Sequence, residues 1–226
     1  MSEGYQYADR VEAGRLLAEK LAEKRYDNPV VLALPRGGVP VAAEVAKALA
    51  APLDLVLVRK IGVPWQPELA LAAVVDGPHP EVVINDDVWR AAGVSEEQFE
   101  KLKAKEMEEI DRRRTAYLGD RERAVIKGAT AIVVDDGIAT GATVRAALKA
   151  LRRGAPEKLV LAVPVAPPDT AARLRREVDE LVCLQTPEPF YAIGVFYRDF
   201  EQMSDDDVVA ILDAIAAPAT RDDDPA

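Results

Sequence analysis

The stretch from Ala131 to Thr143 constrains the fold of this chain more than any other part of the sequence. It opens with an apolar, β-branched run that predicts a buried strand. Two acids, Asp135 and Asp136, follow the run, and a loop rich in glycine and threonine then leads into a helical pattern that stops at Gly154. The sequence therefore predicts a strand, a tight loop and a helix start in immediate succession.

The loop in this stretch suits a phosphate group. Its glycines let the backbone turn and approach a ligand closely, and the unpaired N–H groups at a helix start attract an anion. The hydroxyls of Thr140 and Thr143 can add hydrogen-bond donors. The two acids repel phosphate, but they can accept hydrogen bonds from a diol. Donors for a phosphate beside acceptors for a diol suit a ribose 5-phosphate.

The residues from Val133 to Thr143 resemble the phosphoribosyl pyrophosphate (PRPP) signature of the type I phosphoribosyltransferases, and a looser resemblance extends over residues 8–200. The resemblance implies that Asp135 and Asp136 act in catalysis by holding the ribose hydroxyls and favouring positive charge on the ribose. It implies that the 5-phosphate of PRPP binds to the following residues: Gly137, Ile138, Ala139, Thr140, Gly141, Ala142 and Thr143.

A second glycine-rich loop, residues 35–40, follows an apolar strand expected at residues 30–34. Arg36 could form two hydrogen bonds to a phosphate while Gly37 and Gly38 present backbone N–H groups. Alone this signal is weak, because Gly-Gly turns are common. The resemblance makes this loop the pyrophosphate loop of the family.

Two cations, Arg59 and Lys60, end a third expected strand at residues 53–58. Next to a phosphate site they would complement a pyrophosphate. The alternative is a solvated pair at the start of a loop. The resemblance favours the first interpretation, in which both residues bind pyrophosphate and act in catalysis.

Residues 61–80 are rich in loop signals, and an apolar run at 69–75 could pair with residues 81–84 as a hairpin. The resemblance implies a mobile flap here that excludes water from the reacting centre. Candidates for its tip are Trp65, Gln66 and Glu68, although for Trp65 a partly buried loop anchor is favoured over a ligand contact. The single histidine, His79, is expected to be an exposed loop residue rather than a general base.

A long charged helix is expected from Ser95 to about residue 118, with Ser95 and Gln98 forming a capping box at its start. Its thin apolar stripe predicts a solvent-facing insertion. The basic run at residues 112–114 is expected to form surface ion pairs rather than a phosphate site, because consecutive helix positions point in different directions.

Strands alternate with helices along the rest of the chain, which predicts an α/β fold with a mostly parallel central sheet flanked by helices. Both glycine-rich loops would then lie at the carboxyl edge of the sheet, where such folds bind ligands. Other expected features are a first helix at 8–24 capped by Asp9, strands at 158–163 and 181–184, a helix capped by Asp169 and a last helix capped by Ser204.

We expect one phosphoribosyltransferase-like domain at residues 1–217, with an insertion at about 61–119. The aromatic segment 186–200 could form the small hood that type I members use for the accepting base, or it could simply cover the sheet. Residues 218–226 predict a disordered tail.

The formal net charge of −10 argues against a broad nucleic-acid surface. No signal pattern and no apolar run of membrane-spanning length is evident, so a cytoplasmic location is the default expectation, and no membrane partner is expected. A lone cysteine, Cys183, excludes an internal disulfide and fits a buried strand. A homo-oligomer is compatible with the sequence.

The main hypothesis is transfer of ribose 5-phosphate from PRPP to a nitrogenous base with release of pyrophosphate, and with Mg²⁺ held mainly through PRPP. Alanine at position 139, where 6-oxopurine members carry an aspartate, disfavours a 6-oxopurine acceptor. The alternative is a PRPP- or nucleotide-binding regulator without catalysis. A dinucleotide or P-loop protein fits poorly, because neither glycine pattern is present.

Overall fold

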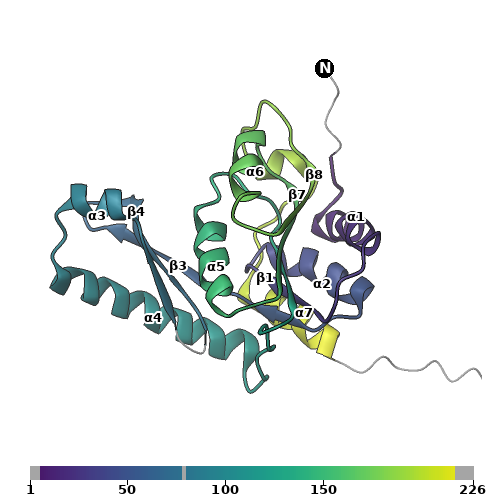
Figure 1. Cartoon of the computed structure of the whole chain (residues 1–226), viewed down its shortest axis with the longest axis horizontal. Coiled ribbons are helices and arrows are strands. Elements are labelled where there is room, and N and C mark those ends of the chain that lie inside the picture. Colours follow the sequence, from purple (N-terminus) through teal and green to yellow (C-terminus); the bar gives the residue numbers. More distant parts are fainter. Residues whose placement is uncertain (1–5, 78–79, 217–226) are drawn as a thin grey trace, which may run out of the picture.

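The computed structural model describes residues 6–77 and 80–216. A parallel five-stranded sheet in the order β2-β1-β6-β7-β8 forms its centre (Figure 1). The strands are β1 (Pro29–Ala33), β2 (Leu53–Leu55), β6 (Thr130–Val134), β7 (Lys158–Val165) and β8 (Glu180–Gln185). The expectation of an α/β fold with a mostly parallel sheet is confirmed. His79 and the tail at 218–226 lie outside the described residues.

Helices cover both faces of this sheet, because successive strand residues point to opposite sides. Val31, Ala33, Ile132 and Val134 pack towards α1 (Arg10–Ala22) and α2 (Gly38–Leu49). Their neighbours in β1 and β6 pack towards α5 (Ala142–Arg153) and α6 (Pro168–Leu174) on the other face. The near-continuous apolar runs of the sequence therefore produce two cores, one on each side of the sheet.

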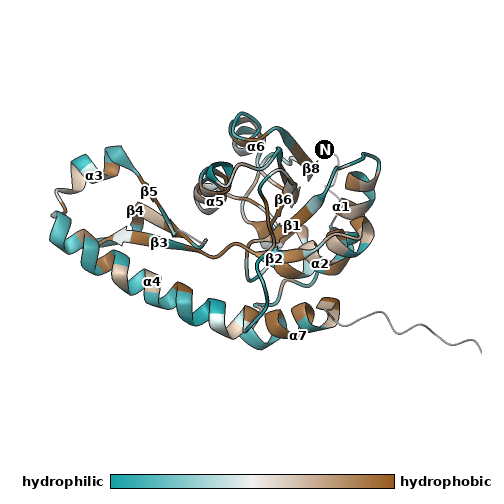
Figure 2. Ribbon diagram, turned by 60° about the horizontal axis from the view of Figure 1, so that its bottom comes forward, coloured by the Kyte–Doolittle hydropathy of each residue, from teal (hydrophilic) through white to brown (hydrophobic). Residues whose placement is uncertain are grey.

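A second sheet projects from this body and carries the long helix (Figures 1 and 2). Its antiparallel strands are β3 (Val58–Val63), β4 (Gln66–Val75) and β5 (Glu81–Ile84), in that order. The short helix α3 (Asp86–Ala92) and the long helix α4 (Glu96–Leu118) follow. We call residues 58–118 the lobe.

The helix α4 is hydrophilic along most of its length, as Figure 2 shows, but it is not wholly exposed. Phe99, Ile110 and Tyr117 are buried and belong to the same core as strand residues of the lobe. The expected capping box is present, with Ser95 and Gln98 bonding to each other's backbone amides. Within the basic run, Arg112 and Arg113 both pair with Glu109, as expected for surface ion pairs.

Three expectations for local structure need correction. The strand expected at 53–58 is two strands, because β2 ends at Leu55 and Val58 begins β3 of the other sheet. Asp169 is not a helix cap, since the N-cap position is taken by Pro167 and Asp169 lies in the first turn of α6. The helix α3, capped by Asn85, was missed. By contrast, the caps expected at Asp9 and Ser204 are present, the latter opening α7 (Asp205–Ala216).

The segment before α1 pairs with the aromatic segment that precedes α7. Tyr7 forms a parallel bridge with Tyr197, its amide donates to the Phe196 carbonyl, and its own carbonyl accepts from the Arg198 amide. The 3-10 helix η1 (Ile193–Phe196) lies in this region. We call residues 6–9 and 195–201 together the clasp.

Candidate functional site

The two glycine-rich loops lie side by side at the carboxyl edge of the parallel sheet. They follow β1 and β6, which are neighbouring strands, and the Leu34 amide donates to the Val134 carbonyl at 2.9 Å just before the loops diverge. This edge is the usual place for a ligand in an open α/β sheet. The fold therefore brings together the two segments that the sequence singled out 100 residues apart.

The loop after β6 leaves most of its amides open. The Ile138 amide donates to the Val165 carbonyl at 2.9 Å, and the Arg145 amide donates to the Gly141 carbonyl at 2.9 Å. For the amides from Ala139 to Thr143 the described part of the chain supplies no backbone acceptor. Gly141 has φ +77°, a left-handed conformation that favours glycine, and it directs the chain into α5. The result is a group of free N–H donors at the positive end of a helix dipole.

The two acids at the end of β6 lie in different surroundings. Asp136 is buried, and its Oδ2 accepts a hydrogen bond from Arg10 Nε at 2.8 Å. Asp135 is partly exposed, and its Oδ1 accepts from the Asp136 amide at 2.9 Å. Asp135 is therefore the less buried residue of the two, and Asp136 is the acid whose carboxylate is held by a cation.

The electrostatics of this acid pair follow from burial and proximity. Burial raises the pKa of Asp135 well above its usual range, and the neighbouring charge of Asp136 raises that pKa further. Burial also raises the pKa of Asp136, while the Arg10 guanidinium opposes that rise. A ligand that supplies positive charge or hydroxyl donors to Asp135 would favour its ionised form.

The loop after β1 is more tightly enclosed by the fold. The Gly38 amide donates to the Leu34 carbonyl at 3.1 Å, so it is not free as the sequence suggested. A Cβ added to Gly37 would lie 2.0 Å from Asp136 Oδ2, which shows that this residue lies directly against the acid. Arg36 is partly exposed and lies 3.7 Å from Asp205 of α7.

Arg59 and Lys60 do not end a strand as expected, because both lie within β3 and point to opposite sides of it. Arg59 Nε donates to Glu106 of α4 at 2.8 Å. Lys60 points to the other side, where its Nζ lies 3.3 Å from Glu68. The structure therefore brings Lys60, but not Arg59, to the side of the lobe that faces the signature helix.

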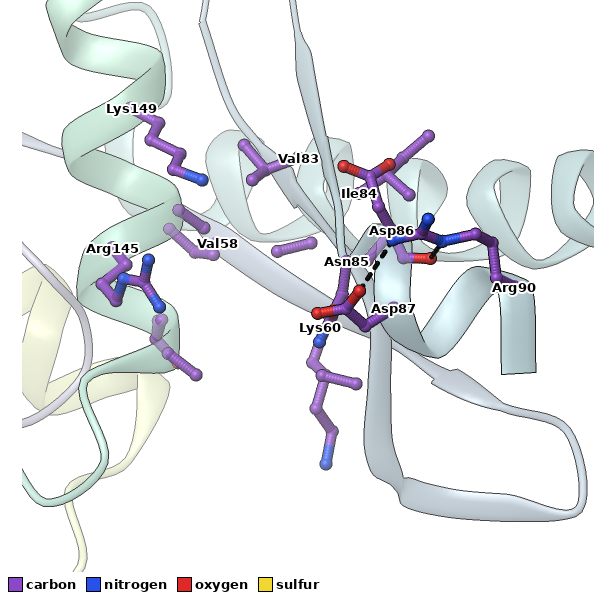
Figure 3. A pocket seen from close by; sticks show the side chains of 16 residues that line it. Val58, Lys60, Val83, Ile84, Asn85, Asp86, Asp87, Arg90, Arg145 and Lys149 are labelled. Atoms are coloured by element: carbon purple, nitrogen blue, oxygen red, sulfur yellow. Dashed lines mark hydrogen bonds and ion pairs between the residues drawn. The ribbon is translucent and has the colours of Figure 1, made fainter. Parts of the chain in front are cut away.

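A cleft of about 450 Å³ separates this side of the lobe from α5. Figure 3 shows Arg145 and Lys149 on α5 opposite Asp86, Asp87 and Arg90 of α3. Small and apolar side chains from the lobe and from α5 also line it, and Thr143 connects it to the signature loop. Arg90 pairs with Asp87 at 2.8 Å on one wall, and Arg145 pairs with Glu177 at 2.7 Å on the other.

The remaining residues that the sequence singled out lie in the β3–β4 turn, in the aromatic segment and in β8. The turn between β3 and β4 contains Trp65, whose side chain is 63% exposed, with Gln66 and Glu68 just beyond it. In the aromatic segment Tyr191 is 82% exposed, whereas Phe196 and Tyr197 are buried. Cys183 is half-buried in β8, and burial raises its pKa to about 11. The aromatic segment therefore both covers the sheet and presents one ring to solvent.

Sequence reasoning missed two residues that contact the acid pair. Arg10 bonds to Asp136 from α1, and the Tyr197 hydroxyl donates to the Asp136 carbonyl from the clasp. Ile193 of η1 lies so close to Gly137 that an added Cβ would meet it at 2.6 Å. No local pattern marks these residues, since each reaches the site only through the tertiary fold.

Two further observations concern ligands and environment. Within residues 6–77 and 80–216, no group of three or more His, Cys, Asp or Glu side chains is arranged to hold a metal ion. Over the same residues, none of the helices combines the length and the hydropathy that crossing a membrane requires.

Comparison with known proteins identifies the family. The family model for the phosphoribosyl transferase domain matches residues 6–201. Proteins from two strains of Mycobacterium tuberculosis, provisionally named phosphoribosyl transferases, are 49% identical over 207 residues. That match covers 92% of this chain but 46% of the relatives, so the chain spans about half the length of those proteins.

The crystal structure of the protein TT1426 from Thermus thermophilus superposes on this chain with a TM-score of 0.78 and 42% identity. The superposition covers 94% of this chain and all of the other. The family match, the relatives and this shared fold agree with one another, and the chain therefore belongs to the phosphoribosyl transferase domain family.

Proposed function

We propose that this protein transfers ribose 5-phosphate from PRPP to a nitrogenous base and releases pyrophosphate. The observation that carries the proposal is the group of open amides from Ala139 to Thr143 next to the partly exposed Asp135. Donors for a phosphate and an acceptor for a diol lie side by side at the ligand-binding edge of the sheet. Membership of the family supports the same activity.

In this proposal the 5-phosphate lies at the start of α5, where the amides, the helix dipole and the hydroxyls of Thr140 and Thr143 meet it. The acid pair lies on the ribose side. Its negative charge would stabilise the positive charge that develops on the ribose as the bond to pyrophosphate breaks. Positioning and electrostatics, rather than a covalent intermediate, would supply most of the rate.

The pyrophosphate would lie between the loop after β1 and the cationic side of the lobe. Arg36 and the Gly37 amide would be the donors from that loop, and Lys60 would be the cation from the lobe, since it lines the cleft beside α5. Arg59 would contribute to the site only after leaving Glu106. Mg²⁺ would enter with PRPP, held by substrate oxygens, and would neutralise charge on the leaving group.

The flap would be the hairpin of β3 and β4, with exposed Trp65 at its tip. Closing this hairpin would exclude water and so favour transfer over hydrolysis. The acceptor would approach from the side of η1, where Ile193 packs against Gly137. Ala139 cannot exchange a proton with a base, so an acceptor other than a 6-oxopurine is proposed.

A binding experiment tests the PRPP site directly. PRPP with Mg²⁺ is titrated calorimetrically into the protein, and ribose 5-phosphate and inorganic pyrophosphate are then tested separately as competitors. We expect both to compete, because each occupies one part of the site. Changing Asp135 and Asp136 together to Asn should abolish PRPP binding, while Asp111→Asn, on the exposed side of α4, serves as a matched control. Unaltered affinity in the double variant would remove the role assigned to the acids.

A second experiment separates an enzyme from a regulator. Pyrophosphate release is followed in a single turnover with PRPP, Mg²⁺ and a panel of purine and pyrimidine bases. Release that depends on a particular base supports transfer. Binding of PRPP without release for any base would instead support a non-catalytic PRPP-binding protein.

A further inference from the structure

We infer that Arg10 is a positioning residue of the site: it holds the Asp136 carboxylate against Gly37 and so leaves Asp135 as the acid that meets the ribose. This inference rests on the proposed function, and it assigns different tasks to the two acids. Asp136 joins the two loops and α1 into one unit, and Asp135 contacts the sugar.

The Arg10 guanidinium is fixed from three directions. Its Nε donates to Asp136 Oδ2 at 2.8 Å, and its Nη1 donates to the Glu201 carbonyl at 2.9 Å. Its central carbon lies 3.9 Å from the centre of the Phe200 ring. A planar guanidinium that bonds in its plane and stacks on an aromatic face has little freedom to turn. Arg10 is therefore set in place by the clasp before any ligand arrives.

Asp136 is held at both its side chain and its main chain. Besides the bond to Arg10, its carbonyl accepts from the Tyr197 hydroxyl. Its carboxylate lies so close to Gly37 that no side chain fits there. The side chains of Arg10 and Asp136 are only 13% and 12% exposed, so the pair lies largely out of solvent. Moving Asp136 towards a sugar would break a shielded ion pair, which is costly.

Asp135 is not the acid that Arg10 holds, so its carboxylate can meet a ligand without breaking that ion pair. Asp135 is partly exposed, and the hydrogen bond from the Asp136 amide to its Oδ1 fixes the direction of its carboxylate. Anything that shifts Asp136 therefore also shifts the donor that orients Asp135. Arg10 thus acts on the sugar-facing acid through its neighbour.

Arg10 also supplies the positive charge that this buried pair needs. The charged or titratable groups facing Asp136 are Arg10 from α1, Asp135 beside it and Tyr197 from the clasp. Two adjacent buried carboxyls without a cation would share a proton. Arg10 opposes the rise in the pKa of Asp136 that burial causes. The acid pair can therefore carry negative charge close to the ribose, where positive charge develops.

The test measures PRPP affinity with Mg²⁺ by calorimetry between about pH 5.5 and 8.5, above the ordinary range of a carboxyl, because burial raises the pKa of both acids. The variants are Arg10→Met, Arg10→Lys, Asp136→Asn and the double variant R10M/D136N. Arg15→Met is the matched control, because Arg15 lies on the same helix, is 68% exposed and pairs with Glu44 away from the site. Thermal denaturation of each variant reports loss of folding separately.

We expect Arg10→Met to weaken PRPP binding by roughly tenfold to a hundredfold, the range for a hydrogen bond to a charged group. The fall in affinity at acid pH should begin at a higher pH than in the natural protein, because the cation that favours ionised Asp136 is gone. Arg10→Lys should recover part of the affinity, since an ammonium can meet Asp136 but cannot reproduce the planar fork. Arg15→Met should match the natural protein.

The double variant keeps the inference testable if Arg10→Met alone does not fold, because it removes the buried ion pair as a whole. We expect R10M/D136N to bind PRPP as well as Asp136→Asn does, since Arg10 acts only through Asp136. Weaker binding by the double variant would mean that Arg10 contacts PRPP itself and would overturn the inference.

Two other outcomes distinguish this inference from the proposed function. If the natural protein binds PRPP and Arg10→Met binds it equally well with the same pH profile, the positioning role is wrong and the proposed function stands. If the natural protein does not bind PRPP at all, both are wrong.

Discussion

The loops after β1 and β6 are both rich in glycine and lie at the same edge of the sheet, but glycine serves a different purpose in each. In the first loop Gly37 has an ordinary helical conformation, and the missing side chain makes room for the Asp136 carboxylate. In the second loop Gly141 has φ +77°, and its Cβ would meet no backbone, the nearest atom being a Thr170 methyl at 3.3 Å. One glycine is needed for space and the other for backbone angle.

The backbone amides of the two loops differ in the same way. The amides of Gly38 and Val39 donate to carbonyls of their own loop region, whereas those from Ala139 to Thr143 find no backbone acceptor among the described residues. The first loop therefore helps to hold the two acids in place. The second loop has backbone N–H groups available to bind a ligand.

The largest effect is expected from Gly37→Ala. The added Cβ would lie 2.0 Å from Asp136 Oδ2, so the acid must move. A displacement of this size in a site that works by positioning costs about a hundredfold, which should appear in PRPP affinity measured by calorimetry. Gly128→Ala controls for destabilisation as such, because alanine is strained there at φ +70° while its Cβ has no neighbour within 4 Å. Equal affinity of Gly37→Ala and the natural protein would contradict the role of space in this loop.

Asp135→Asn should lower PRPP affinity by roughly tenfold to a hundredfold, through loss of a charged acceptor for the ribose. Its effect on stability should be opposite. Because burial raises the pKa of Asp135 in the folded protein, the ionised group opposes folding as the pH rises through that pKa. The neutral amide removes this cost, so the melting temperature at about pH 8, above the ordinary range of a carboxyl, should increase. A lower melting temperature there than in the natural protein would contradict this.

Gly141→Ala is expected to have a smaller effect on binding, about tenfold or less, and to reduce the free energy of unfolding by about 1–2 kcal/mol through strain at positive φ. Asparagine tolerates this conformation better than alanine does. We therefore expect Gly141→Asn to be more stable than Gly141→Ala in denaturant titrations, whereas Gly37→Asn should be worse than Gly37→Ala. If the Ala and Asn variants ranked in the same order of stability at both positions, the two glycines would serve one purpose.

The smallest effect on ligand binding is expected from Arg59→Gln. Arg59 pairs with Glu106 on the α4 side of β3, away from both loops. Calorimetry should therefore give the same affinity for inorganic pyrophosphate as in the natural protein, while the free energy of unfolding falls by about 1 kcal/mol or less. Lys60→Gln is the informative partner, because Lys60 faces the signature helix and its loss should weaken pyrophosphate binding. Weaker binding in Arg59→Gln would mean that the arginine turns towards the ligand.

Much of the body of the fold could be predicted because its signals are local. The apolar runs of β1 and β6, the caps at Asp9 and Ser95 and the glycines of both loops each specify a conformation within a few residues. The boundary between β2 and β3 could not be predicted, because the apolar run continues through Val56 and Leu57 while the chain passes from one sheet to another. Tertiary contacts alone decide where such a run divides.

The candidate site was predictable where it consists of consecutive residues, and not where it depends on distant ones. Arg59 and Lys60 were both expected at the pyrophosphate because they were placed together at the end of a strand. Once they lie in a strand, alternation sends them to opposite faces. Arg10 resembles any exposed arginine in the first turn of a helix, and only the fold brings it to Asp136, 126 positions further along the chain.

The clasp has a consequence for how the protein is made. Its bridge joins Tyr7 to Tyr197. During synthesis, Tyr7 therefore cannot form this bridge until Tyr197 has left the ribosome. Contacts of such long sequence separation pay a loop-closure entropy that local helices and hairpins do not. We therefore expect the parallel sheet to form during synthesis and the Arg10–Asp136 ion pair to close late, so that competence for PRPP marks the completed molecule.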